Sequence, residues 1–130
     1  MRYLLDTRVW LWLATEPERL SPASRAAAAD HANELLLSAA SSWEIAIKYS
    51  AGKLHLPEEP ATWVPTSMAR SGVRGLHIAH AHALEVATLP RHHADPFDRL
   101  LIAQARLESL VILTVDPVFS RYDVEVMPVV

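Results

Sequence analysis

The sequence predicts an α/β fold in which helices cover both faces of a mainly parallel sheet. Short apolar runs typical of buried strands alternate with longer helix-forming segments along the chain. Strands of a parallel sheet are apolar on both sides because helices pack against both faces. The chain has 130 residues, 51% of them hydrophobic, and no linker divides it, so we expect a single domain over residues 1–130.

The predicted strands are short and rich in leucine and β-branched residues. The clearest are ELLLS at 34–38 and LVILTVD at 110–116, because runs of this length and composition are typical of buried strands. The segment VWLWLAT at 9–15 is apolar on every side and fits either a buried helix or a strand. The other segments that we expect to be extended are 3–6, 75–79 and 124–130.

Capping residues, prolines and glycines mark the predicted helices. Ser21 can cap a helix over 21–32 that has Pro22 in its first position and alanines in its body. A helix after ELLLS extends to Ser50, and Gly52 is placed to end it before the connector GKLHLP. The remaining helices are expected at 60–71, interrupted near its start by Pro65 and closed by Gly72 and Gly75, at 80–89 and, most clearly, at 96–109.

Composition excludes several classes of protein. The chain has 12 basic and 15 acidic residues, a net charge of −3, which does not fit a nucleic-acid binder with a broad basic face. A nucleic acid would have to be held by local basic groups or by bound cations. Without cysteine there is no disulfide framework and no thiolate metal site. No run approaches the ~18 apolar residues of a membrane span, and Asp6 interrupts any secretory signal, so we expect a cytoplasmic protein.

Four acids are placed where sites form in parallel α/β proteins, outside the carboxyl ends of the strands. Asp6 and Asp116 each end a predicted strand, whereas Glu44 and Asp98 lie in the first turns of predicted helices. Two carboxylates about 4 Å apart repel by roughly 4 kcal/mol at an effective dielectric near 20, so such a cluster requires protons or cations. Oxygen ligands without cysteine favour Mg²⁺ or Mn²⁺ over zinc.

Each acid also has a structural alternative. Asp95, with Pro96 behind it, is close to an ideal helix cap, and Asp98 suits the first turn of the same helix. Glu44 can complete a capping box with Ser41 or pair with Lys48 one turn later. Asp116 precedes Pro117 and can start a turn. Asp6 closes an apolar strand, and a carboxylate in that position needs a partner or water.

An ordered set of motifs extends over nearly the whole chain: LLDTRVWLW, SAASSWEIAIK, GKLHLP and HADPFDRLLIAQA, followed by LTVD. In this order and spacing the chain resembles the PIN-domain ribonucleases, and most closely the VapC type, the toxin half of bacterial toxin–antitoxin pairs. The resemblance implies a three-layer α/β/α sandwich and Mg²⁺- or Mn²⁺-dependent hydrolysis of RNA that leaves 5′-phosphate and 3′-hydroxyl ends. It also implies a homodimer and a cognate antitoxin as partners.

The resemblance also implies roles for individual residues. Asp6, Glu44, Asp98 and Asp116 fall on the catalytic, metal-binding acids of the family, with Asp6 and Asp98 as the surest ligands. Thr7 and Thr114 would hydrogen-bond a ligand water or a phosphate oxygen, and Asp95 would be the helix cap. Arg8 departs from the family pattern, which often has histidine there. His93 matches the family's loop histidine. Apart from the resemblance, Lys48, Lys53, Arg91 and Arg99 are candidate phosphate contacts, with Arg99 assigned to substrate binding, and the alternative for each is a solvated surface side chain.

Other features support weaker interpretations. His80 and His82 are spaced two apart and His92 and His93 are adjacent, so surface and loop roles are favoured over a histidine metal site. Trp10, Trp12 and Trp43 can stack bases, but their apolar context favours core or interface packing, and residues around Trp10 and Trp12 and from 60 to 73 are candidate partner surfaces. Two competing functions are a non-catalytic metal- and RNA-binding module and a receiver-like signalling domain, which would need a lysine after Asp116.

Overall fold

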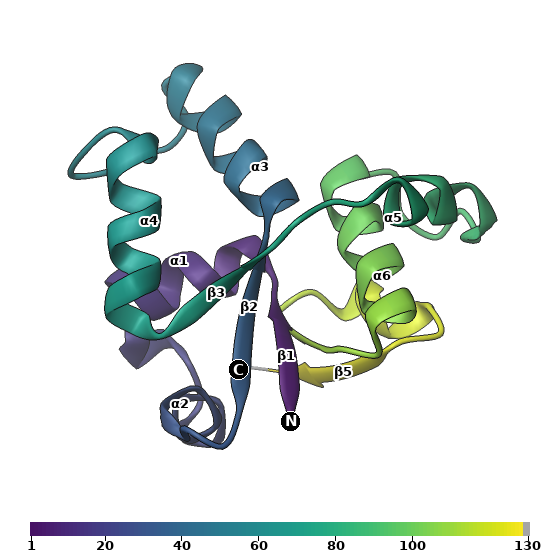
Figure 1. Ribbon diagram of the computed structural model, residues 1–130, viewed down its shortest axis with the longest axis horizontal. Coiled ribbons are helices and arrows are strands. Elements are labelled where there is room, and N and C mark those ends of the chain that lie inside the picture. Colours follow the sequence, from purple (N-terminus) through teal and green to yellow (C-terminus); the bar gives the residue numbers. More distant parts are fainter. Residues whose placement is uncertain (129–130) are drawn as a thin grey trace.

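The computed structural model describes residues 1–128 and shows a five-stranded parallel sheet (Figure 1). All four pairings between neighbouring strands are parallel. The last two residues of the predicted strand 124–130 lie outside the described residues. The strands are β1 (Arg2–Leu5), β2 (Glu34–Ser38), β3 (Val73–Leu76), β4 (Val111–Thr114) and β5 (Glu125–Pro128).

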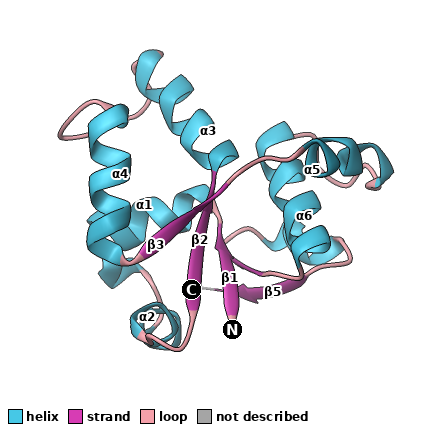
Figure 2. Cartoon of the chain, viewed as in Figure 1, coloured by secondary structure: helices cyan, strands magenta, loops and turns pink. Residues whose placement is uncertain are grey.

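Helices lie on both sides of this sheet (Figure 2). In Figure 1, α1 and α4 flank one face, whereas α5 and α6 flank the other. No helix within residues 1–128 has the length and apolar character needed to cross a membrane. The helices are α1 (Thr7–Thr15), α2 (Pro22–Ala29), α3 (Ala39–Ser50), α4 (Pro60–Ser71), α5 (His80–Glu85) and α6 (Pro96–Glu108), with 3-10 turns at Pro17–Arg19 (η1), Val86–Thr88 (η2) and Pro117–Arg121 (η3).

In the central strands, successive buried residues point into two different cores. Leu5, Leu37 and Leu113 pack in one core with Val9 and Trp10 of α1. Their neighbours in the central strands, which include Leu4, Leu36 and Ile112, pack in the second core with α6. Side chains of a strand alternate between faces, so strands that are apolar at every position require a helical layer on each side. The predicted three-layer α/β/α sandwich is therefore confirmed.

The strand order β3-β2-β1-β4-β5 determines where a site can form. The chain passes from β1 through β2 to β3 on one side, and β4 returns to the other side of β1. Where the connections from two neighbouring strands run to opposite sides of the sheet, a crevice opens at the carboxyl ends of those two strands. Asp6 follows β1 and Thr114 ends β4, so both lie at this crevice.

Receiver domains have the strand order 2-1-3-4-5. The order found here differs, which excludes the receiver-like signalling domain.

Several predicted boundaries are corrected. The ambiguous segment 9–15 belongs to helix α1, and the helix predicted over 21–32 ends at Ala29. The extended segment predicted at 75–79 begins two residues earlier, as strand β3 over Val73–Leu76. It begins there because Gly72 ends α4 with φ of 68° and Val73 then pairs with Leu35. Gly75 therefore lies within β3 and does not close the helix.

Two helix predictions also need correction. Pro65 does not interrupt α4, which is continuous from Pro60 to Ser71, although a proline at this point removes one backbone hydrogen bond. The helix predicted over 80–89 ends at Glu85 and is followed by the short 3-10 turn η2. Leu89 after that turn is buried in the second core, so packing of the loop against α6 determines this ending.

Candidate active site

A cavity of about 610 Å³ lies at the carboxyl edge of the sheet, next to the crevice between β1 and β4. Its lining comes from segments far apart in the sequence: the start of α1, the body of α3, the α3–α4 loop, the start of α6 and the residues after β4. The four acids singled out from the sequence all line it. The charged lining residues are Asp6, Glu44, Asp95, Asp98 and Asp116 against Arg8, Lys48 and Lys53, with His93 also present.

Asp6 joins β1 to α1 and is buried at the base of the cavity. Its backbone N–H donates to the Leu113 carbonyl at 2.9 Å, which extends the pairing of β1 with β4 by one residue. Its carboxylate accepts hydrogen bonds from the Thr114 hydroxyl at 2.6 Å and from the Arg8 N–H at 3.2 Å. Burial raises the pKa of Asp6, and the charge of Glu44 adds to that rise against these two hydrogen bonds.

The two aspartates of DPFD have different environments. Asp95 Oδ1 accepts hydrogen bonds from the N–H groups of Phe97 at 2.8 Å and Asp98 at 3.2 Å, which confirms Asp95 as the cap of α6. Asp98 points into the cavity, where its Oδ2 lies 2.8 Å from His93 Nε2. Burial raises the pKa of Asp98 to about 6 despite that hydrogen bond, and the charges of Asp95 and Asp6 contribute to the rise.

Glu44 is 6% exposed and lies in the second turn of α3. Its Oε2 pairs with Lys48 Nζ at 2.6 Å, whereas its Oε1 is buried without a hydrogen-bond partner in the described part of the chain. The capping-box alternative for Glu44 is wrong, because Ser38 caps α3. The pairing with Lys48 is confirmed. A buried carboxylate oxygen without a donor is costly unless a ligand satisfies it.

Hydrogen bonds of Thr7, Thr114 and Asp116 connect the segments around the cavity. Thr114 Oγ1 donates to Asp6 and accepts from the Asp116 N–H at 3.0 Å, so it connects two of the acids. Thr7 donates its hydroxyl to Ser41 Oγ at 2.8 Å, which ties α1 to α3. Asp116 Oδ1 accepts from the Val118 N–H at 2.9 Å, so this acid also starts a turn as the sequence allowed.

The donors in the cavity fit a hard divalent cation. Carboxylates outnumber lysines and arginines in the lining, and only Glu44 is paired with one of them. Ligand atoms of His93, Asp98 and Asp116 all lie within 4.8 Å of one another. The sequence interpretation gave His93 no metal role, but the structure places it in this group. Carboxylate oxygens are the ligand type that suits Mg²⁺ or Mn²⁺.

Arg99 does not extend into the acidic cavity. Its guanidinium donates to the carbonyl oxygens of Pro90 at 2.9 Å and Val86 at 3.1 Å, and to further acceptors of the same loop. These bonds turn its side chain toward the loop at 86–93, and the assignment of Arg99 to substrate binding stays a prediction. The further acceptors are the carbonyl oxygens of Leu89 and His93 and the hydroxyl of Tyr122.

The three tryptophans singled out from the sequence differ in how far each is buried. Trp10 is fully buried and packs against Trp63 with ring centroids 6.2 Å apart, so it cannot stack bases or contact a partner. Trp12 is partly buried beneath the Arg19 guanidinium. Trp43 is 58% exposed and lies edge-on against Phe97. Trp10 itself is therefore excluded from the candidate partner surface around Trp10 and Trp12, whereas the partly buried Trp12 stays a candidate. Within the second candidate, 60–73, Trp63, Val64 and Val73 belong to the core.

The family model for the PIN domain matches residues 3–125 of the chain. The chain belongs to the PIN domain family. Ribonuclease VapC22 of Mycobacterium tuberculosis is 34% identical to this PIN domain over 103 residues, which cover 78% of the chain and 77% of the relative. Ribonuclease VapC16 of the same organism is 52% identical over 59 residues, 45% of the chain and 42% of that protein, so this match spans less than half of either protein.

Solved structures show the same fold. A chain of the VapBC2 complex from Rickettsia felis, bound to a promoter DNA fragment, matches the PIN domain over 100% of both chains with a TM-score of 0.73 and 15% identity. A chain of DNA-bound VapBC from Salmonella typhimurium matches over 98% of both chains with a TM-score of 0.72 and 16% identity. The predicted PIN-like fold and the resemblance to the VapC type are thus confirmed.

The raised pKa of Asp98 predicts how stability depends on pH in the absence of metal ions. Its pKa is about 6 in the folded protein against an ordinary value of 3.8, so the proton on Asp98 stabilises the fold at acidic pH, and this stabilisation is lost as pH rises through about 6. Asp98→Asn removes that titration. In thermal unfolding with a chelator, we expect the wild type to lose more stability from acidic to neutral pH than Asp98→Asn does.

Mg²⁺ in place of the chelator should raise the melting temperature of the wild type at neutral pH and leave that of Asp98→Asn nearly unchanged, because an ion that binds only the folded state stabilises it. Identical pH profiles for the two proteins would contradict the placement of Asp98 in a desolvated acidic cavity.

Proposed function

We propose that this PIN domain is an Mg²⁺- or Mn²⁺-dependent endoribonuclease and the toxin of a toxin–antitoxin pair. The observation that carries the proposal is the meeting of Asp6, Glu44, Asp98 and Asp116, from four separate segments, in one cavity at the crevice of the sheet. The relatives named as VapC ribonucleases support RNA as the substrate class. Because its substrate is cellular RNA, we place the protein in the cytoplasm.

In this proposal Asp6 and Asp98 are the principal metal ligands, and Glu44 and Asp116 complete or orient the coordination. His93 is an added candidate, since its ring nitrogen lies beside Asp98. When bound, the ion would lower the pKa of a water molecule and offset the charge that develops on the phosphate. In-line attack at phosphorus with departure of the 3′ oxygen leaves 5′-phosphate and 3′-hydroxyl ends.

The protein's own groups hold the carboxylates in place before an ion arrives. The Thr114 hydroxyl and the Arg8 N–H hold Asp6, and Lys48 holds one oxygen of Glu44 while the other stays unpartnered. Ligands fixed in this way need little reorganisation on binding, which favours catalysis by positioning. Gly52, with φ of 73°, turns the chain after α3 so that Lys53 reaches the cavity as a candidate phosphate contact.

Loss of a single ligand should abolish cleavage without unfolding the protein. Asp6→Asn and Asp98→Asn each keep the side-chain size but remove a charge needed for the ion, and we expect at least a hundredfold loss of RNA cleavage in Mg²⁺ or Mn²⁺, on the order of the effect of removing one charge-stabilising group. Asp95→Asn is the matched control, because asparagine caps a helix as well as aspartate. It should retain cleavage within a few-fold.

Cleavage is measured on purified protein with RNA and a chelator control, and circular dichroism checks that each variant is folded. Full activity of either Asp6→Asn or Asp98→Asn would contradict the assignment. Saturable RNA binding by the wild type without scission would instead support the alternative, a non-catalytic metal- and RNA-binding module.

We further propose two protein partners, a second copy of the chain and a cognate antitoxin. The antitoxin rests on the solved structures of similar fold, which are chains of VapBC complexes. For the second copy, Trp43 and Ile47 supply exposed apolar surface one turn apart on α3. Light scattering should give twice the chain mass of 14.5 kDa, and a monomeric mass at micromolar concentration would contradict the homodimer.

A further inference from the structure

A second pocket of about 460 Å³ adjoins the acidic cavity, and its lining is basic. His93 lines both spaces, so the pocket lies directly beside the carboxylates. Its other lining residues are Arg91, His92, Ala94 and Arg99, and no carboxylate is among them. This is a local concentration of positive charge in a chain whose net charge is −3.

Arg99 supplies a positive charge that no acid neutralises. Its guanidinium donates only to neutral acceptors, namely four carbonyl oxygens and the Tyr122 hydroxyl. No carboxylate oxygen within residues 1–128 lies 4.0 Å or less from a nitrogen of the Arg99 guanidinium. A partly buried arginine held by carbonyl groups keeps its full charge. Arg99 therefore both braces the loop at 86–93 and makes the pocket electropositive.

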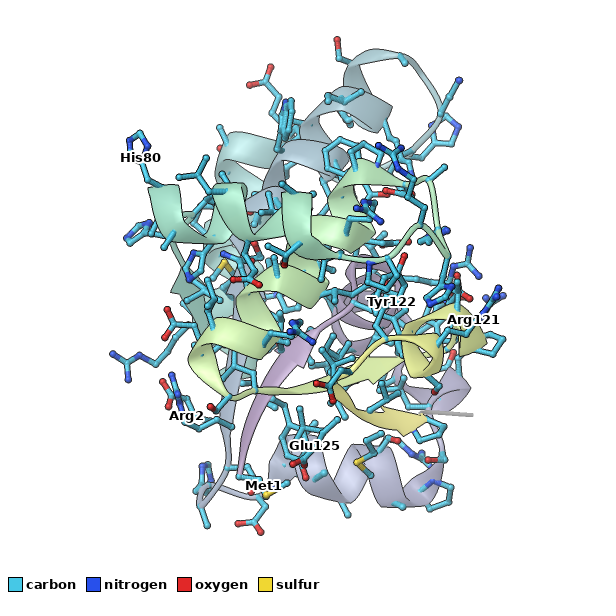
Figure 3. The ribbon with its side chains drawn as sticks, turned by 90° about the vertical axis from the view of Figure 1, so that its right-hand side faces the viewer. Met1, Arg2, His80, Arg121, Tyr122 and Glu125 are labelled. Carbon is cyan, nitrogen blue, oxygen red and sulfur yellow. The ribbon has the colours of Figure 1, made fainter. Side chains whose placement is uncertain are left out.

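Arg91 and His92 complete the pocket from the loop that Arg99 braces. Arg91 is exposed and makes no ion pair within the described residues, so its five N–H donors are available to a ligand. The His92 ring lies edge-on against Tyr122, with ring centroids 5.1 Å apart. Tyr122 thus contacts both His92 and Arg99, and Figure 3 shows it beside Arg121 on the flank that carries α6.

We propose that this basic pocket binds an RNA phosphate next to the one that is cleaved, with Arg91 as the principal contact and Arg99 as a fixed supporting charge. The inference rests on the proposed function and adds a substrate subsite to it. The carboxylates of the acidic cavity repel a phosphodiester unless a cation is bound there. The adjoining pocket instead offers an arginine whose paired N–H groups match phosphate oxygens. Separate places for the ion and for a neighbouring phosphate explain how an acidic chain holds a polyanion.

The test uses a short RNA that the wild-type protein cleaves at one site. Versions of this RNA carry a neutral methylphosphonate at the linkage on either side of the scissile one. We expect Arg91→Ala to raise KM about tenfold with little change in kcat, as loss of a charge-assisted hydrogen bond to phosphate predicts. One of the two methylphosphonates should raise KM of the wild type by a similar factor and leave KM of Arg91→Ala almost unchanged.

The matched control is Arg25→Ala, which removes the same charge from exposed surface on α2 (Figure 1), an element that contributes to neither pocket. It should raise KM less than Arg91→Ala, and its response to the methylphosphonates should equal that of the wild type. Arg91→Lys should recover part of the lost affinity. The salt dependence of RNA binding should also become shallower in Arg91→Ala, by about one released counterion.

The outcomes separate the two proposals. If the wild type cleaves RNA but Arg91→Ala has the KM of Arg25→Ala, or keeps the full response to the methylphosphonates, the phosphate subsite is wrong and the proposed function stands. If Arg91→Ala loses kcat equally on all three substrates, Arg91 shapes the loop and does not bind phosphate, which also overturns the inference. If the wild type cleaves no RNA in Mg²⁺ or Mn²⁺, both proposals fall.

Discussion

Burial of several carboxylates in one cavity, where they also repel one another, is the constraint on which the rest of the molecule depends. Asp6, Glu44 and Asp98 are all largely removed from water, and each raises the energy of its neighbours as long as it is charged. Burial and these neighbouring charges raise the pKa values of Asp6 and Asp98. Such an arrangement destabilises the fold while the acids are charged, and it persists where the surrounding structure holds it rigidly and protons or a cation offset the charge.

The sheet provides that rigidity. Hydrogen bonds from Asp6 to Leu113 and from Thr114 to Asp6 attach the first acid to both central strands, whose other residues are buried in two cores. Asp98 is positioned by the Asp95 cap at the start of α6, and Glu44 by the packing of Ile45 in the first core. The acids thus belong to elements whose stability comes from apolar burial elsewhere. The free-energy cost of the buried charges is balanced by apolar packing in the two cores, the first of which includes Ile45 at the wall of the cavity.

The sequence predicts the features that local chemistry controls. The acids at the strand ends, the Asp95 cap and the Gly52 and Gly72 helix ends follow from short-range rules. The structure confirms the cap and the two helix ends and places Asp6 directly after β1, but β4 ends at Thr114, two residues before Asp116. The features that the sequence does not predict are those that depend on tertiary packing. Trp10 and Trp43 lie in similar apolar motifs, but only one faces the core. The direction of Arg99 depends on a loop whose path the sequence does not specify, and His93 enters the acid group through that same loop. Roles for the acids in metal binding remain predictions.

The most direct test of the central claim is a crystal structure of the protein grown with Mn²⁺, with anomalous scattering used to locate the ion. We expect an anomalous peak in the cavity, bonded to carboxylate oxygens of Asp6 and Asp98. An empty cavity beside a well-ordered Mn²⁺ elsewhere on the protein would contradict it, because the gathered acids would then have a purely structural explanation.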